Sequence, residues 1–225
     1  MPTPESSPPR RGIRAAFYLT LFALIAAVLL STVERLTGQR ITDNELAERL
    51  AALSAVLPGD QYDNQPHLDR IYVRNAELLG SDEALPVYRA RNGEQPVAAV
   101  LTAVAPNGFS GEIRLLIAID AGGEVAGVRV IEHRETPGLG DAIEADKSNW
   151  IESFTGLDGS SLATNPLARE WILDRDGGRF DHITSATVTS RAVVKAVRNA
   201  VIYFDLNREK IFTIPAAAQD EGPER

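Results

Sequence analysis

Hydroxyl side chains cluster directly before a strongly apolar segment near the C-terminal end of the chain. The stretch 181–190 reads Asp-His-Ile-Thr-Ser-Ala-Thr-Val-Thr-Ser. One explanation is a helix cap, because a Ser or Thr at a helix start accepts hydrogen bonds from otherwise unpaired N–H groups. The other is a phosphate site, because the same N–H groups and the positive end of the helix dipole attract anions. In that setting the hydroxyl of Thr187 could bear a phosphoester, although spacing alone favours the cap.

A second candidate segment, residues 133–141, follows a predicted strand and reads His-Arg-Glu-Thr-Pro-Gly-Leu-Gly-Asp. Pro137 restricts one backbone dihedral, while Gly138 and Gly140 permit tight turning and close approach of the backbone to a ligand. An ordinary strand-to-helix loop, with Asp141 as the helix cap, explains the same residues. Neither segment matches a P-loop or a dinucleotide-binding fingerprint, which argues against nucleotide hydrolysis.

The composition excludes several kinds of site. The 225 residues include no cysteine, which rules out disulfides, thiolate zinc sites, Cys-ligated iron–sulfur clusters and thiol nucleophiles. The histidines (His67, His133 and His182) lack metal-ligand spacing, and we expect no metal site. Residues 1–33 carry +2 from three Arg and one Glu, which leaves −10 for the rest of a chain whose net charge is −8. Such an acidic domain repels nucleic-acid phosphates, so we do not expect nucleic-acid binding.

An uncharged apolar stretch, residues 15–33, lies near the N-terminus. As a helix rising about 1.5 Å per residue it would span roughly 28 Å, close to a bilayer core of about 30 Å. Arg10, Arg11 and Arg14 precede it, so the positive-inside rule places the N-terminus in the cytoplasm and the remainder outside. A cleaved signal peptide is the alternative, but residues 30–34 make a poor cleavage site and the apolar run is long for a signal. We therefore expect a retained anchor.

The remainder of the chain is predicted to be α+β, with an antiparallel sheet and flanking helices. Strands in two hairpins, with Asn-Gly and Ala-Gly-Gly turns, are expected over residues 85–91, 96–104, 112–120 and 125–132. Apolar residues at helical spacing predict helices over residues 41–57, 141–154 and 190–204. Residues 60–84 show weak periodicity and are expected to form a loop with short elements.

These elements predict five consecutive parts. They are a cytoplasmic N-terminus (1–14), a transmembrane helix (15–33), a juxtamembrane helix with a connector (34–84), the main domain (85–212) and a disordered tail (213–225). The Pro- and Ser-rich start of the chain is also expected to be disordered.

Together the two candidate segments resemble the signatures of a known family. The run D-x-x-T-S-A-T at 181–187, followed by T-S and an AVVKAV helix, is similar to the D-x-x-[ST]-G-A-T flavinylation motif of the FMN-binding domain. The H-R-E-T-P-G-L-G run at 133–140 resembles the second signature, and Asn-Gly-Phe-Ser-Gly at 107–111 precedes both. This domain occurs in the G subunit of the Rnf electron-transport complex and in the C subunit of the sodium-pumping NADH:quinone oxidoreductase. The compact length and the residues around 176–194 favour the Rnf family, with the quinone reductase as the alternative.

The resemblance implies that FMN is joined to Thr187 through a phosphoester, which makes the chain a phosphoprotein. A separate magnesium-dependent flavin transferase, with FAD as the donor, would attach it. Asp181, Thr184 and Ala186 fill other motif positions, while Ser185 stands where the family usually has glycine. If that position needs a positive φ, serine would hinder attachment.

The second signature contributes further expected flavin-binding residues. Glu135, Thr136, Gly138 and Leu139 match the positions that lie near the flavin in this family. We expect Thr136 to donate or accept a hydrogen bond and Leu139 to make apolar contact with the isoalloxazine.

The implied function is electron transfer within a complex of the bacterial inner membrane that couples it to ion translocation. By resemblance, the complex passes electrons between ferredoxin and NAD, and this chain is a periplasmic carrier that is not catalytic alone. Residues 15–33 contain no ionisable side chain, so the ion pathway is expected in other subunits. A membrane-anchored flavin redox sensor, a structural anchor with Thr187 as a simple cap, and a secreted flavoprotein are the remaining alternatives.

Overall fold

The computed structural model describes residues 10–57, 59, 61–160, 162, 164–165 and 168–217, without the side chains of 10–11, 33–46 and 48–49. It divides into two compact units, Met1–Arg49 and Leu50–Arg225. The Pro- and Ser-rich start and most of the C-terminal tail, both expected to be disordered, lie outside the described residues.

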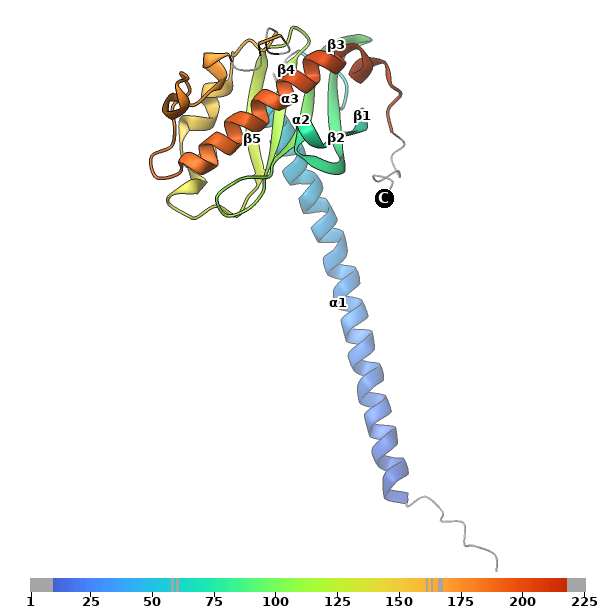
Figure 1. Cartoon of the computed structure of the whole chain (residues 1–225). Coiled ribbons are helices and arrows are strands. Elements are labelled where there is room, and N and C mark those ends of the chain that lie inside the picture. The colour runs from blue at the N-terminus through green and yellow to red at the C-terminus, as the bar shows by residue number, and fades with distance from the viewer. Residues whose placement is uncertain are drawn as a thin grey trace, which may run out of the picture. The chain divides into compact units, whose positions relative to one another are not determined.

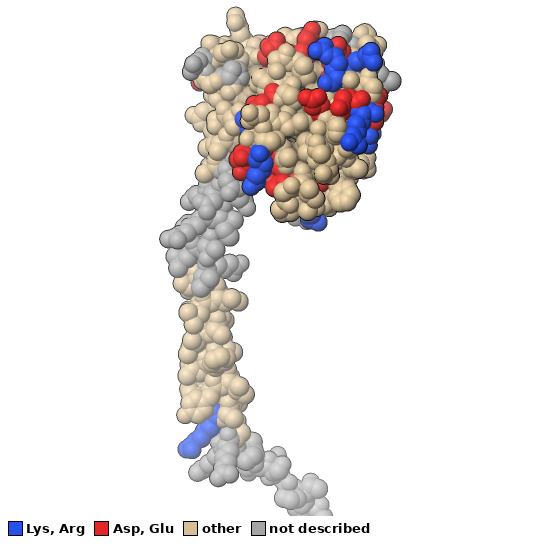
Figure 2. Space-filling model, turned by 90° about the vertical axis from the view of Figure 1, so that its left-hand side faces the viewer, with Lys and Arg blue, Asp and Glu red and all other residues tan. Residues whose placement is uncertain are grey.

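Helix α1 (Arg10–Val56) is continuous over 47 residues, so the expectation of two separate helices was wrong. Gly38 is the only Gly or Pro between the two expected segments, and one glycine costs a helix only about 1 kcal/mol. Within α1, Gly12–Thr32 is long and apolar enough to cross a membrane, and none of it is buried. Figure 2 shows this stretch as a column of uncharged side chains with basic charge only near its start.

The second unit is built on a five-stranded antiparallel sheet in which each strand pairs with its neighbour in sequence (Figure 1). The strands are β1 (Arg70–Asn75), β2 (Ser81–Asn92), β3 (Gln95–Ala105), β4 (Ile113–Asp120) and β5 (Val125–Glu132). The predicted fold class is confirmed. Strand β1 and the short helix α2 (Ala76–Leu79) belong to the region that was expected to be a loop with short elements.

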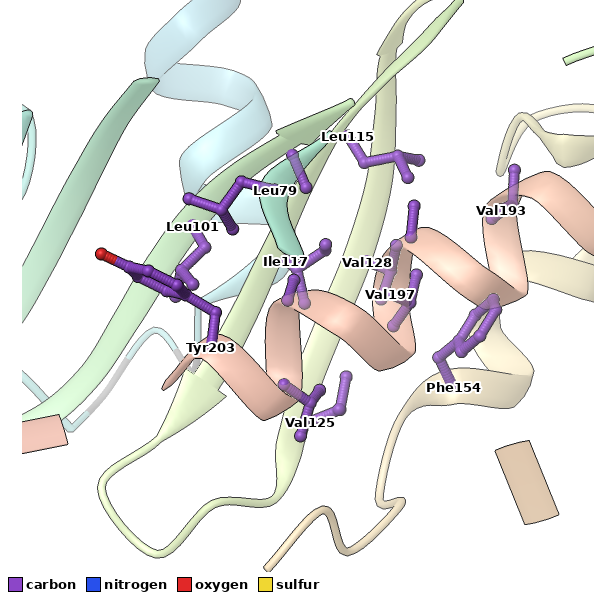
Figure 3. Packing of buried hydrophobic residues seen from close by; sticks show 14 of the residues in the cluster. Leu79, Leu101, Leu115, Ile117, Val125, Val128, Phe154, Val193, Val197 and Tyr203 are labelled. Atoms are coloured by element: carbon purple, nitrogen blue, oxygen red, sulfur yellow. The ribbon is translucent and has the colours of Figure 1, made fainter. Parts of the chain in front are cut away.

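Helix α3 (Thr187–Thr213) lies across one face of this sheet. Figure 3 shows Val193 and Val197 of α3 in one cluster with Ile117 and Val128 of the sheet, and all four side chains are fully buried. Burying an aliphatic side chain of this size contributes about 1.5–3 kcal/mol, so this face holds α3 in place.

The other face of the sheet is covered by the last turns of α1. Leu53, Val56 and Leu57 pack there with a second set of buried strand residues, among them Val100 and Leu116. Both faces are therefore buried, which explains why the middle strands are almost continuously apolar rather than alternating.

Two predicted helices differ from the structure. The expected helix over 141–154 was wrong, because the chain forms two short 3₁₀ helices, η1 (Gly140–Ile143) and η2 (Asn149–Phe154). The Ser148 hydroxyl caps η2 by accepting from the Trp150 N–H at 3.1 Å, which separates the two turns. Helix α3 starts at Thr187 and ends at Thr213, so it is longer at both ends than the predicted 190–204 and runs past the expected domain end at 212.

The C-terminal end of α3 is held by arginines of β2. Nη1 of the buried Arg89 donates to the carbonyls of Ile211 at 3.0 Å and Ile214 at 2.5 Å, and its Nη2 pairs with Asp69. Arg91 donates to a further carbonyl of the same helix end. The last carbonyls of a helix have no partner inside it, so these arginines complete α3.

Candidate functional site

The start of α3 is set by the backbone rather than by a hydroxyl cap. Ser185 has a φ of +70°, and Ala186 occupies the cap position with a φ of −132°. An alanine side chain cannot accept a hydrogen bond, and no side chain caps α3. The Ser190 hydroxyl instead donates back to the Ala186 carbonyl at 3.0 Å. The simple cap explanation for Thr187 therefore does not hold, and the first N–H groups of α3 have no side-chain acceptor.

A pocket of about 500 Å³ opens at this helix start and joins both candidate segments. Its volume falls in the range of about 300–1,000 Å³ that is typical of small-molecule sites. The lining residues are Phe109, Glu135, Thr136, Leu139, Gly140, Arg175, Thr184, Ser185, Ala186, Thr187, Val188 and Thr189. The sheet and α3 thus bring together segments that are far apart in the sequence.

The turn in the second segment explains its proline and glycine. The Thr136 carbonyl accepts from the N–H of Leu139 at 3.1 Å, and Gly138 has a φ of +77°. Pro137 followed by glycine at positive φ is the arrangement that a type II turn requires. The turn carries Leu139 to the pocket, while Gly138 itself does not line it.

Glu135, which lines the pocket, connects three segments of the chain. This carboxylate is only 5% exposed, and it accepts from the Ser110 N–H at 3.0 Å and from the Thr189 hydroxyl at 2.6 Å. A Cβ at Gly140 would lie 2.7 Å from Oε2, and one at Gly108 would lie 2.8 Å from Oε1. Both glycines are therefore required for close packing around the carboxylate.

His133 holds the backbone of Glu135 through a hydrogen bond. Its Nδ1 accepts from the Glu135 N–H at 3.0 Å, so Nε2 carries the proton and donates to Glu144 at 2.8 Å. This neutral histidine orients the segment that carries Glu135.

Three exposed apolar side chains border the pocket. Phe109 is 71% exposed, Leu139 48% and Val188 46%. They come from three different segments. Apolar side chains that converge on a concavity are suited to a flat aromatic ligand.

Asp174 and His182 hold the basic residue of the pocket. Arg175 Nε donates to His182 Nε2 at 3.0 Å, and His182 Nδ1 lies 2.9 Å from both carboxylate oxygens of Asp174. The hydrogen bond from His182 lowers the pKa of the Asp174 carboxyl, with a smaller contribution from the Arg175 N–H.

Most of the residues predicted from the sequence line the pocket, but Gly138 and Asp181 do not. The Asp181 carbonyl accepts from Trp150 Nε1 at 2.8 Å, and Asp181 lines a neighbouring depression with Phe180. The expected flavin-binding residues did not include Phe109, Gly140, Arg175, Val188 and Thr189, which also line the pocket. The Asn-Gly-Phe-Ser-Gly run already signalled Phe109, and the hydroxyl cluster signalled Thr189. No sequence signal pointed to Arg175.

Known families match most of the chain. The RnfG N-terminal region matches residues 10–56, and the FMN-binding domain matches residues 108–202. The G subunit of an ion-translocating oxidoreductase complex from Pseudomonas aeruginosa is 44% identical over 212 residues, 94% of this chain and 97% of that relative. The G subunit from Shewanella loihica is 41% identical over 92% of this chain and 96% of its own length, and that from Shewanella baltica is 40% identical over 90% and 94%.

These relatives support the Rnf assignment and not the quinone-reductase alternative, since each is named as the G subunit of an ion-translocating oxidoreductase complex. Both the apolar Gly12–Thr32 stretch and all the residues that line the pocket lie within the matched regions. The chain belongs to the family of Rnf G subunits of ion-translocating oxidoreductase complexes and carries the FMN-binding domain of that family.

Proposed function

We propose that this chain carries FMN joined covalently to Thr187 and relays electrons between partner cofactors of an Rnf-type complex. The observation that carries the proposal is the convergence of both signatures on one pocket with Thr187 in its lining. A bound flavin would supply one- and two-electron chemistry, which is the cofactor's own contribution.

The residues of the pocket fit FMN in chemistry as well as in volume. Thr187 is the first residue of α3, where the uncapped N–H groups and the helix dipole favour a phosphate. Phe109, Leu139 and Val188 offer apolar surface for the isoalloxazine and exclude water from it. The Thr136 side chain, also in the lining, is the candidate hydrogen-bonding partner of the ring.

Attachment follows from the position of the hydroxyl. In the transferase reaction, the Thr187 oxygen would form a P–O bond to the FMN phosphorus of FAD as the bond to AMP breaks. AMP would leave, and a base of the transferase would take the threonine proton. The exposed neighbours Ser185 and Val188 leave this helix start accessible to a second protein.

Membrane placement completes the proposal. The Gly12–Thr32 stretch anchors the chain in the inner membrane, and Arg14 with its basic neighbours keeps the N-terminus in the cytoplasm. The flavin domain then faces the periplasm. No ionisable side chain lies within 15–33, so ion movement belongs to other subunits.

A denaturing gel of the membrane fraction, viewed under ultraviolet light, tests the covalent flavin. Cells that contain the transferase should yield a fluorescent band for the wild type and for Thr187→Ser, which keeps a hydroxyl. Thr187→Val, which matches threonine in shape but lacks the hydroxyl, should give a dark band of equal protein amount. Intact mass of each protein provides the control for loading. A dark, unmodified wild-type chain would overturn the proposal.

A further inference from the structure

Among the described residues that line the proposed flavin pocket, Arg175 is the only one with a positively charged side chain. It lies in η4 (Asp174–Asp176), ahead of α3 in the sequence. Its Nε is occupied by His182, and no described residue accepts from its two terminal amino groups. The guanidinium therefore retains a fork of donors for a ligand.

A closed set of hydrogen bonds fixes the direction of this side chain. Because His182 Nε2 accepts from Arg175, the ring proton is on Nδ1, which faces the Asp174 carboxylate at 2.9 Å. The same carboxylate accepts from the Arg175 N–H at 2.7 Å. Both the backbone and the side chain of Arg175 are thus held by this histidine–aspartate pair.

The loop that carries Arg175 is itself attached to α3. Asp176 accepts two hydrogen bonds from Arg191 of α3, at 2.6 and 2.8 Å. The backbone at Gly178 is packed so closely that a Cβ there would lie 1.8 Å from the Ile172 carbonyl oxygen. The loop therefore keeps a defined position relative to the start of α3.

The charges in the pocket call for a cation near Thr187. A phosphodiester carries one negative charge, and the only other charged lining residue is Glu135, whose carboxylate bonds to Thr189 two residues from the attachment site. The start of a helix supplies about half a positive charge, which does not balance both anions. A guanidinium pairs with phosphate oxygens through two parallel hydrogen bonds.

We infer that Arg175 binds the phosphodiester of the flavin at Thr187, and that His182 and Asp174 act as positioning residues for the guanidinium. This inference rests on the proposed function, because it requires flavin at Thr187.

A comparison of loaded and unloaded chains tests Arg175. The full-length chain is purified in detergent from cells with and without the flavin transferase, and intact mass identifies each form. The Tm of the loaded wild type should exceed that of the unloaded wild type. Arg175→Gln should lose about half of this increment or more, since a charged hydrogen-bonded pair is removed. Arg175→Lys should lose less, because the charge remains.

Two controls isolate the contact with the flavin. The unloaded Arg175→Gln variant should have the same Tm as the unloaded wild type. Arg179 is an exposed residue of the same loop that lies outside the pocket lining, so Arg179→Gln should keep the full increase in Tm on flavin loading. If flavin loading raised the Tm of Arg175→Gln as much as that of the wild type, the inference would be overturned and the proposed function would stand. An unloaded wild type from cells with the transferase would instead overturn the proposed function.

The role of His182 is tested by two amide variants. Gln at 182 places an amide near Nε2 and can still accept from Arg175, whereas Asn reaches only the Nδ1 position beside Asp174. His182→Gln should therefore keep more of the increase in Tm on flavin loading than His182→Asn. In the Arg175→Gln background, neither substitution at His182 should reduce the increase in Tm on flavin loading further, because the effects of substitutions at coupled residues are not additive. Equal, additive losses would show that His182 does not act through Arg175.

Discussion

Ser185 has the only positive φ among the non-glycine residues that the structure describes. Its +70° turns the chain so that α3 starts at Thr187, and its position is the one at which related motifs have glycine. An L-residue in this left-handed region costs about 1–2 kcal/mol through contact of Cβ with the backbone. Thr187, the proposed attachment site, therefore follows a strained residue in this chain.

Ser185→Gly should raise the free energy of unfolding by about 0.5–1 kcal/mol, the relief of strain minus the greater chain entropy of glycine. Urea denaturation of the chain in detergent measures this difference. Ser185→Ala is the matched control and should bring no gain, since it retains Cβ. Identical stability of the glycine and alanine variants would show that no strain is stored there.

At the scale of elements, α3 has the proposed flavin pocket at its N-terminal end and the arginine clamp of Arg89 and Arg91 at its C-terminal end. Arg89 and Arg91 lie on β2, where alternating arginines would normally indicate a solvated face. The structure buries Arg89 instead, at 2% exposure, against the end of α3 and Asp69. The clamp limits sliding of α3 along the sheet, and this keeps Thr187 at the pocket.

Arg89→Lys should lower the free energy of unfolding by about 1.5–3 kcal/mol, because one ammonium cannot replace the planar fork of donors. Urea denaturation provides the measurement. The exposed Arg179→Lys is the control and should change the stability by no more than about 0.5 kcal/mol. Equal effects at the two positions would contradict the clamp.

The loop over 172–182 should detach in acid. Hydrogen bonds from His182 and Arg191 lower the pKa values of Asp174 and Asp176, respectively. A carboxyl whose pKa is lower when folded stabilises the protein above its unfolded pKa, near 3.9, and loses this contribution as the pH falls through the folded pKa. The urea midpoint of the wild type should thus fall more steeply below about pH 4 than that of Asp174→Asn/Asp176→Asn. Tryptophan fluorescence follows the transition, and parallel curves would contradict the assignment.

At the scale of the whole molecule, a bare apolar helix is joined to an acidic domain. On the face shown in Figure 2, acidic and basic side chains lie intermixed rather than in one patch of either sign. This distribution does not favour binding to a polyanion. The charge asymmetry that matters is along the chain, with +2 over residues 1–33 and −10 over residues 34–225.

The absence of cysteine permits a direct test of topology with single introduced cysteines. In intact spheroplasts, a membrane-impermeant maleimide should label Glu94→Cys, which lies in the exposed turn between β2 and β3. Ser7→Cys should react only after permeabilisation, because the basic start of the chain remains inside. The opposite labelling pattern would reverse the proposed orientation.

The sequence by itself determined the features that depend on neighbouring residues. The apolar run over 15–33, the two hairpins with their glycine turns and the α+β class follow from local periodicity and turn chemistry. Resemblance to the motif around Thr187 identified the FMN-binding family for the same reason, since the motif is a short continuous string.

Only the tertiary structure decided the features that depend on contacts between distant residues. The edge strand β1 is defined by its pairing with β2, and the apparent helix over 141–154 divides because its apolar residues pack into the core as two turns. Glu135 is buried because Ser110 and Thr189 satisfy its oxygens. The pocket that contains Thr187 in its lining is formed by segments that meet only when α3 packs on the sheet. These contacts cannot be predicted from the spacing of residues along the chain.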